Sequence, residues 1–154
     1  FKLSENKYHE AGTYTNLGIL FSYQKDYYQA ELDLKTAINI YKNVHAEEAR
    51  IMNAQVELAR VYYLQEEYAK ATALCKDIIK LNDVNKHKAQ AFELLGDINY
   101  KLSNIESSLK DYEEAKGILV TQSMPCDYVC KKVADVYFNL GDYQKAANSY
   151  KECF

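Results

Sequence analysis

The sequence contains very little proline and glycine. Among 154 residues there are one proline and five glycines, and 48% of the residues are hydrophobic. Proline and glycine disfavour helix interiors, whereas the abundant alanine, leucine, lysine, glutamate and glutamine favour them. The composition therefore favours helices over sheets, in a chain long enough for one domain with a buried core.

Long apolar runs and an excess of charge are also missing. No stretch approaches the roughly 20 apolar residues that span a bilayer, and no secretory signal opens the chain. Lysine and arginine number 19 against 22 acidic residues, which gives a formal net charge of −3 with no basic block. Neither a membrane nor a nucleic acid is expected as a partner.

The sequence offers no recognisable metal or disulfide framework. Of four cysteines only Cys126 and Cys130 are close, and their spacing places them on one helical face rather than in a zinc knuckle. This favours free thiols in a reducing compartment. His9, His45 and His87 fall one hairpin apart, so they form no helical metal pair. We expect no metal, no cofactor and an intracellular location, in the cytoplasm or the nucleus.

Catalytic patterns are equally scarce. There is no glycine-rich phosphate loop after a strand, and no serine or cysteine has a base in a nucleophile context. The acidic pairs, such as Glu66 and Glu67, are typical of solvated helix faces. The sequence therefore predicts that the chain is not an enzyme.

A fourfold internal repeat is the main positive feature. Its anchor is a small residue, spaced by 41, 37 and 38 residues, at Gly18, Ala59, Gly96 and Ala134. Three further columns follow each anchor at fixed offsets: Tyr27, Tyr68, Ile105 and Tyr143; Ala30, Ala71, Ser108 and Ala146; and Leu34, Cys75, Tyr112 and Tyr150. Such a period indicates a stack of similar units, each of which buries its apolar face against its neighbours.

Each column has a physical interpretation. The anchor is expected to be small because the two helices of a hairpin cross there, with the small residue of the second helix facing it. The tyrosines that begin the second helices can pack back over the turn. In the turns QKDY, LSNI and LGDY, Asp or Asn is expected to cap the next helix. The predicted helix pairs are 5–24 with 27–43, 46–65 with 67–82, 85–102 with 104–120, and 125–140 with 142–154, and Pro125 is expected in the first turn of its helix.

The repeat resembles the tetratricopeptide repeat (TPR) family. The signature residues of the first repeat are Tyr14, Leu17, Gly18, Phe21, Tyr27, Ala30, Leu34 and Ala37, and those of the fourth are Ala134, Tyr137, Gly141, Tyr143, Ala146 and Tyr150. The third repeat departs most, with Asn99, Ile105 and Ser108 in columns that are usually aromatic or alanine. Spacings above the usual 34 residues are similar to the long repeats of kinesin light chains, Leu-Gly-Asn-repeat polarity adaptors and some bacterial peptide-sensing regulators.

The resemblance implies an all-α, right-handed α-solenoid of about four antiparallel helix hairpins. We expect residues 1–154 to form a single TPR-like domain with repeats at 5–43, 46–82, 85–120 and 125–154. Because the chain begins at Phe1 and stops inside an expected helix, we also expect it to be a segment of a larger protein with further TPR repeats.

The resemblance also implies a concave groove lined by first-helix side chains. The residues predicted to contact a partner there are Asn16, Tyr23, Glu57, Arg60, Tyr63, Glu93, Asp97, Tyr100, Lys101, Lys131, Lys132, Asp135 and Phe138. The aromatic column and the alternating charges suit a partner helix or extended segment with apolar anchors. The carboxylate clamp of chaperone-binding members is not predicted, because Thr15, Ile19 and Glu57 stand at its positions.

These features favour a non-catalytic protein–protein interaction scaffold, part of an adaptor or assembly subunit. Two alternatives remain open. In one, the solenoid is an architectural subunit that is held in a multiprotein complex through its edges and ends. In the other, it is a regulatory domain that senses a peptide.

Overall fold

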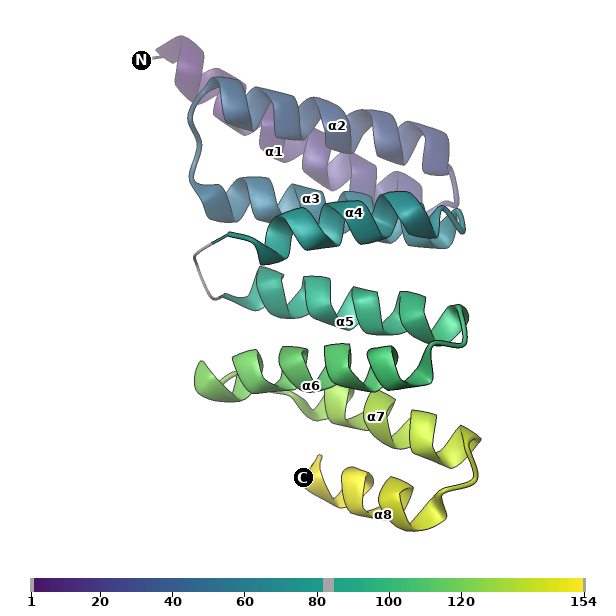
Figure 1. Ribbon diagram of the computed structural model, residues 1–154. Helices are drawn as coiled ribbons and strands as arrows, with labels where there is room; N and C mark the ends of the chain where they lie inside the picture. The colour runs from purple at the N-terminus through teal and green to yellow at the C-terminus, as the bar shows by residue number, and fades with distance from the viewer. Residues whose placement is uncertain (1, 82–84, 154) are drawn as a thin grey trace. The chain divides into compact units, whose positions relative to one another are not determined.

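The computed structural model describes residues 2–81 and 85–153, which form eight α-helices joined by short turns (Figure 1). In chain order the helices are α1 (Lys2–Tyr23), α2 (Tyr27–Asn43), α3 (Glu48–Leu64), α4 (Tyr68–Ile79), α5 (Lys86–Lys101), α6 (Ile105–Thr121), α7 (Asp127–Asn139) and α8 (Tyr143–Glu152). No strand occurs within the described ranges. The predicted helices are confirmed to within a few residues. Residues 82 and 154, which we expected in helices, lie outside the described ranges.

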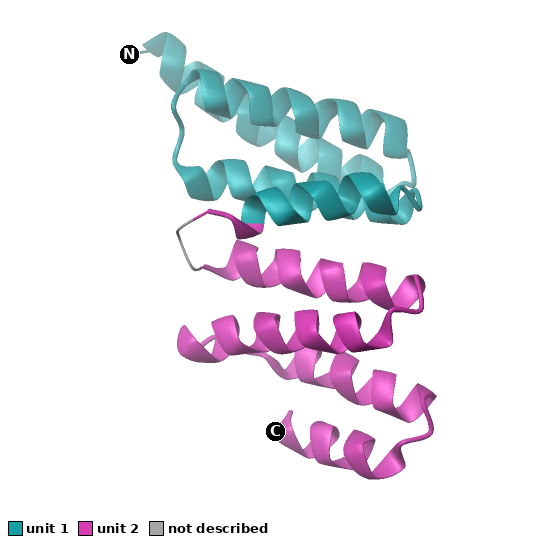
Figure 2. Cartoon of the chain, viewed as in Figure 1, with its two compact units in different colours: residues 1–78 teal, residues 79–154 magenta. Residues whose placement is uncertain are grey.

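The helices form two compact units, residues 1–78 and 79–154 (Figure 2). In the first unit α1 packs along α2, and α3 packs on both of them. In the second unit α5 packs along α6, α6 contacts α7, and α7 packs along α8. The second unit therefore contains two consecutive helix hairpins, α5–α6 and α7–α8.

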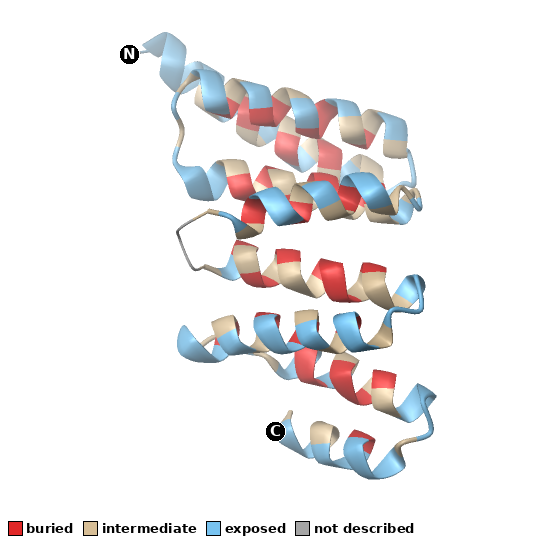
Figure 3. Cartoon of the chain, in the orientation of Figure 1, coloured by how far each residue is buried: buried red, intermediate tan, exposed pale blue. Residues whose placement is uncertain are grey.

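The buried side chains follow the inward faces of the helices (Figure 3). The second unit has a core cluster drawn from α5, α6 and α7, made of Ala89, Tyr112, Ala115, Leu119, Val129, Val133 and Val136. A smaller cluster in the first unit joins Ala11 to Ala37 and Tyr41. Apolar positions three and four residues apart thus supply the cores, as helical periodicity requires.

The small anchors lie where the helices of a hairpin cross. A Cβ atom added at Gly96 would lie 2.4 Å from Cε1 of Tyr112, and one added at Gly18 would lie 2.6 Å from Cγ of Leu34 and 3.2 Å from the carbonyl oxygen of Ala30. Real Cβ atoms essentially never approach so closely. The predicted reason for the small residue is confirmed at both glycines.

Polar contacts take the place of apolar ones in the third repeat. The buried Ser108 hydroxyl donates a hydrogen bond of 2.8 Å to the carbonyl oxygen of Gly96. Asn99 donates from its side-chain amide to a carboxylate oxygen of Asp111 at 2.7 Å. Two of the three departures from the family pattern, Asn99 and Ser108, are therefore hydrogen-bonded to the facing helix.

The predicted caps are confirmed at two turns and wrong at a third. Asp26 accepts from the Gln29 backbone N–H, and Asp142 accepts from that of Lys145, both at 3.1 Å. Asn104 makes no side-chain capping bond to α6. Its amide points back across the turn instead and donates to the Asn99 side-chain oxygen at 3.5 Å.

The turn aromatics pack as expected, but Pro125 does not lie in a helical turn. The Tyr68 ring contacts Tyr63, and the Tyr143 ring contacts Phe138. α7 begins at Asp127, one residue after its N-cap Cys126. The Cys126 carbonyl accepts the first backbone hydrogen bonds of α7, so Pro125 lies just before the cap and the prediction was wrong by two residues.

Replacing Gly96 by alanine tests the close crossing. The added Cβ forces the buried Tyr112 ring to move, a cost of overpacking that exceeds the helix-propensity gain, so we expect Gly96→Ala to lower the free energy of unfolding by roughly 1–2 kcal/mol. Gly117→Ala on α6 is the matched control, because nothing lies within 4 Å of its added Cβ. It is expected to stabilise the protein by up to about 1 kcal/mol. Urea unfolding measures the change in the free energy of unfolding for both variants. Equal changes in Gly96→Ala and Gly117→Ala would contradict the close crossing.

Candidate functional site

In the first unit the predicted partner-binding residues lie on α1 and α3. Asn16 and Tyr23 are exposed on α1, with 83% of Tyr23 accessible. On α3 the Arg60 guanidinium donates to a carboxylate oxygen of Glu57 at 3.0 Å, and Tyr63 is half-buried beside the next turn. The charges of α3 thus pair with each other, whereas the α1 side chains remain open to solvent.

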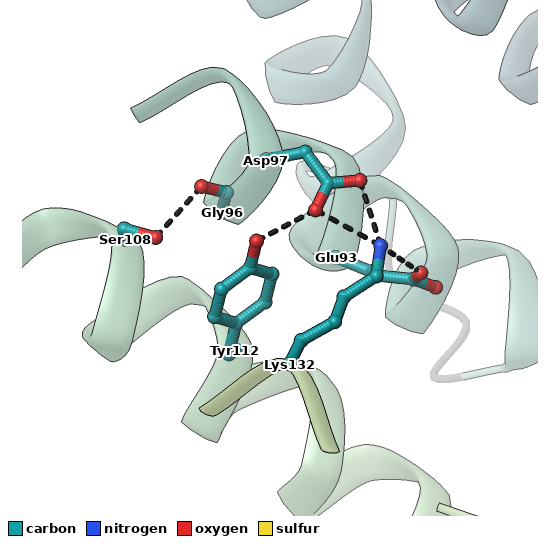
Figure 4. Close-up of polar contacts among 6 residues, drawn as sticks. All are labelled: Glu93, Gly96, Asp97, Ser108, Tyr112 and Lys132. Atoms are coloured by element: carbon teal, nitrogen blue, oxygen red, sulfur yellow. Dashed lines mark hydrogen bonds and ion pairs between the residues drawn. The ribbon is translucent and has the colours of Figure 1, made fainter. Parts of the chain in front are cut away.

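In the second unit a polar cluster joins three helices (Figure 4). The Lys132 ammonium of α7 lies 2.6 Å from Oε1 of Glu93 and 2.8 Å from Oδ2 of Asp97, both on α5. The Tyr112 hydroxyl of α6 donates to Oδ1 of Asp97 at 2.6 Å. This cluster brings together three of the predicted groove residues and adds Tyr112.

The crossing at Gly96 explains how the cluster is positioned. Glu93 and Asp97 are four residues apart, so they project from the same face of α5. The Tyr112 ring lies against Gly96, which places its hydroxyl beside the next residue, Asp97. The Lys132 ammonium lies 5.9 Å from the centroid of the same ring, within the range of a cation–π contact.

The cluster is half-buried and carries an excess of negative charge. The side chains of Glu93, Asp97 and Lys132 are 15%, 22% and 32% exposed. Burial lowers the pKa of Lys132, but the Asp97 and Glu93 carboxylates outweigh burial, and the pKa lies above its ordinary value. Lys132 thus forms ion pairs with two carboxylates, and the three ionised groups together carry one net negative charge.

The fourth repeat contains a second Asp–Tyr pair. Asp135 accepts a hydrogen bond from the Tyr150 hydroxyl of α8 and forms an ion pair of 2.8 Å with Lys131. Burial raises the pKa of Asp135, but its bonds to Lys131 and Tyr150 outweigh burial and lower the pKa below its usual value. As in Asp97 and Tyr112, the aspartate directly follows the small anchor and the tyrosine lies 15 residues further along. Our sequence analysis missed this pairing, although the shared 15-residue separation was visible.

The remaining predicted residues lie near a shallow pocket of about 360 Å³. Its walls combine apolar side chains with polar ones, namely Tyr100, Lys101, Ser103, Ile105, Val136, Asn139 and Leu140. Asn139 donates to the Tyr100 hydroxyl at 2.8 Å. Phe138, which is 55% exposed, packs its ring against Tyr143. Lys101 is exposed, and we find no ion pair for it within residues 2–81 and 85–153.

Neither a metal site nor a membrane span is found in the described parts of the chain. No group of three or more histidine, cysteine, aspartate or glutamate side chains there could hold a metal ion. No helix there is long and apolar enough to cross a bilayer.

Replacing Lys132 by methionine tests the cluster. Loss of the ammonium leaves two half-buried carboxylates without their cation, so we expect Lys132→Met to reduce the free energy of unfolding by roughly 1–3 kcal/mol at pH 7. Lys131→Met is the matched control, because this neighbouring side chain is mostly exposed, and no measurable loss is expected. Urea unfolding measures both, and equal losses would contradict the proposed role of Lys132.

A comparison of the wild type with Lys132→Met at different pH values gives a second test. Because the folded-state pKa of Lys132 is raised, its contribution is complete below the unfolded-state pKa of about 10.4 and is lost as the pH rises through the folded-state value. The stability difference between the wild type and Lys132→Met should therefore stay constant from pH 7 to about pH 10 and then decrease. A difference that grows above pH 10 would contradict the raised pKa.

Comparison with known proteins identifies the repeats. Sequence models of the tetratricopeptide repeat match residues 11–48 and 132–154. The first stretch covers the later part of α1 and all of α2, and the second covers the later part of α7 and all of α8. No curated protein matches the sequence.

Solved structures resemble the chain in fold at low sequence identity. A Rap protein in complex with competence and sporulation factor has 16% identity and a TM-score of 0.84; the match covers 95% of this chain but only 42% of the Rap protein. A putative kinesin light chain of Podospora anserina, with nearly identical TPR-like repeats, has 15% identity and a TM-score of 0.73, over 94% of this chain and 74% of that one. PilF of Pseudomonas aeruginosa has 13% identity and a TM-score of 0.57, over 97% and 78%.

The matched repeats, the small residues at the hairpin crossings and the fold of these neighbours agree with one another. Residues 11–48 and 132–154 thus match tetratricopeptide repeats, and the described chain has an all-α helical repeat fold of the solenoid type.

Proposed function

We propose that the chain is a non-catalytic scaffold that binds a protein or peptide segment along the exposed faces of its first helices, α1, α3, α5 and α7. The observation that carries this proposal is the set of large side chains on these helices that their own unit does not bury. Tyr23 and Phe138 are mostly exposed, and Lys101 stands beside the pocket without an ion pair in the described residues. Aromatic side chains next to polar ones are the usual anchors of protein interfaces.

The charges of the second unit indicate the chemistry of such a partner. The Glu93–Asp97–Lys132 cluster retains one negative charge in a half-buried place, where a charge interacts more strongly than at an open surface. Lys101 offers a positive charge at the edge of the pocket. A segment with an apolar anchor between a basic and an acidic residue would match both.

A sensory role has one further observation in its favour. The Rap protein whose fold this chain shares was solved in complex with competence and sporulation factor. A sensory role, in which a short peptide binds the same first-helix faces, is therefore a more specific form of the proposed scaffold. In either form we expect a single four-repeat domain that acts inside the cell.

The architectural alternative also rests on a specific observation. Large apolar side chains are exposed on second helices as well, namely Tyr28 and Leu32 on α2 and Val120 on α6. A complex that contacted the second helices of the hairpins would cover these side chains and leave the first helices exposed.

Site-specific photo-crosslinking distinguishes the two proposals. The photoreactive analogue p-benzoylphenylalanine is placed at Phe138 on α7 in one protein and at Val120 on α6 in another, both exposed in the second unit. In native extract we expect a discrete protein or peptide adduct from position 138 and none from position 120. Mass spectrometry identifies the adduct.

Charge reversal near the pocket provides the control. Lys101→Glu should abolish the adduct at position 138 while helical content, measured by circular dichroism, stays unchanged. If the adduct forms at position 120 only, the scaffold binds through its edges. If Lys101→Glu leaves the adduct intact, the proposed charge match at the pocket is wrong.

A further inference from the structure

Two cysteines lie side by side at the start of α7. Cys126 is the N-cap of the helix and Cys130 lies one turn further on, and their Sγ atoms are 4.0 Å apart. The two cysteines are not joined by a disulfide bond. The polar cluster and the proposed binding face do not use either thiol.

The two cysteines differ in their exposure to solvent. Cys126 is half-buried, whereas Cys130 is buried with 2% of its surface exposed. Burial, with a smaller contribution from Cys126, raises the pKa of the Cys130 thiol to about 12. Cys130 is therefore a neutral thiol at physiological pH and a poor first nucleophile, because the thiolate is the reactive form.

The backbone leaves room for the two sulfur atoms to meet. A disulfide requires the Sγ atoms to approach to about 2.05 Å. Cys126 has φ −123° and ψ 6°, outside the helical conformation that α7 adopts from Asp127 onward. Rotation about the Cα–Cβ bond of Cys126 moves its Sγ relative to Cys130 and leaves the backbone hydrogen bond from the Cys130 N–H to the Cys126 carbonyl oxygen in place.

We propose that Cys126 and Cys130 form a dithiol–disulfide modification site that reacts with low-molecular-weight disulfides such as oxidised glutathione. The Cys126 thiol loses its proton and attacks one sulfur of the small disulfide. The S–S bond of that molecule breaks, a mixed disulfide forms on Cys126, and the first small thiol leaves with a proton. Cys130 then loses its proton and attacks Sγ of Cys126, which releases the second small thiol. The protein is oxidised by two electrons and the small disulfide is reduced by two.

The other cysteines have different surroundings and serve as matched controls. Cys75 is buried in the first unit. Cys153 lies near the end of α8, where its thiol donates to the carbonyl oxygen of Ser149 at 3.3 Å. We therefore expect that replacing either Cys75 or Cys153 by serine leaves disulfide formation between Cys126 and Cys130 unchanged.

The test uses the whole chain and oxidised glutathione, followed by alkylation of remaining thiols and tryptic digestion. Residues 117–131 form one tryptic peptide that contains both Cys126 and Cys130. We expect this peptide to lose the mass of two hydrogen atoms in the wild type, Cys75→Ser and Cys153→Ser. Cys126→Ser should not react, and Cys130→Ser should stop at a stable glutathione adduct on Cys126. Circular dichroism checks that each variant is folded.

Three outcomes would overturn the proposal. In the first, a glutathione adduct persists on Cys126 in the wild type, so that Cys130 does not resolve it. In the second, Cys126 becomes linked to Cys153 instead. In the third, the folded wild type does not react, although the urea-unfolded chain forms the disulfide under the same conditions.

Discussion

The close helix crossing at Gly96 determines much of the polar structure of the second unit. At Gly96 the absence of a Cβ lets the Tyr112 ring lie directly against α5. That contact brings the tyrosine hydroxyl to Asp97, and Asp97 in turn binds Lys132 of the next hairpin. One packing contact thus leads to a hydrogen bond and then to an ion pair between hairpins. The proposed binding face is therefore coupled to the core beneath it.

The Asp–Tyr pair of the third repeat recurs in the fourth and is missing from the first two. There, Ile19 and Arg60 stand where the aspartate would be, and Leu34 and Cys75 stand where the tyrosine would be. The hairpins of the second unit therefore place a polar link at a position where the first repeat packs a leucine against its glycine. A hydrogen-bonded link of this kind holds a charged residue of the first helix in one orientation. A scaffold that must recognise charge requires such orientation.

The helices were predictable because their signals are local. The fourfold columns and the helical periodicity located all eight helices to within a few residues, and the glycine anchors were predicted for the correct steric reason. The failures concern choices between equivalent polar partners. Asn104 could cap α6 or form a hydrogen bond with Asn99, and the amino-acid sequence does not show which of the two occurs. Likewise, six turns in the described residues contain a residue with positive φ. Glycine signals this conformation only at Gly141, whereas the other five turns use Lys25, His45, Glu66, Ser103 and Ser123.

The predicted site residues were correctly expected on the first helices, but their contacts were not. Lys132 was predicted as a charge for a partner, whereas it lies between two carboxylates of its own chain. Such an arrangement depends on the distance between neighbouring helices, which a repeat pattern does not give. The sequence analysis named Tyr112 only as a member of a repeat column, and its hydroxyl contact with Asp97 follows from the three-dimensional crossing.

A double-mutant cycle between Gly96→Ala and Lys132→Met tests the link between crossing and cluster most directly. If the Tyr112 ring positions Asp97, its displacement in Gly96→Ala already weakens the ion pair. Loss of Lys132 should then cost at least about 0.5 kcal/mol less in that background than in the wild type. Additive effects on the free energy of unfolding would contradict the account and show that the cluster forms independently of the crossing.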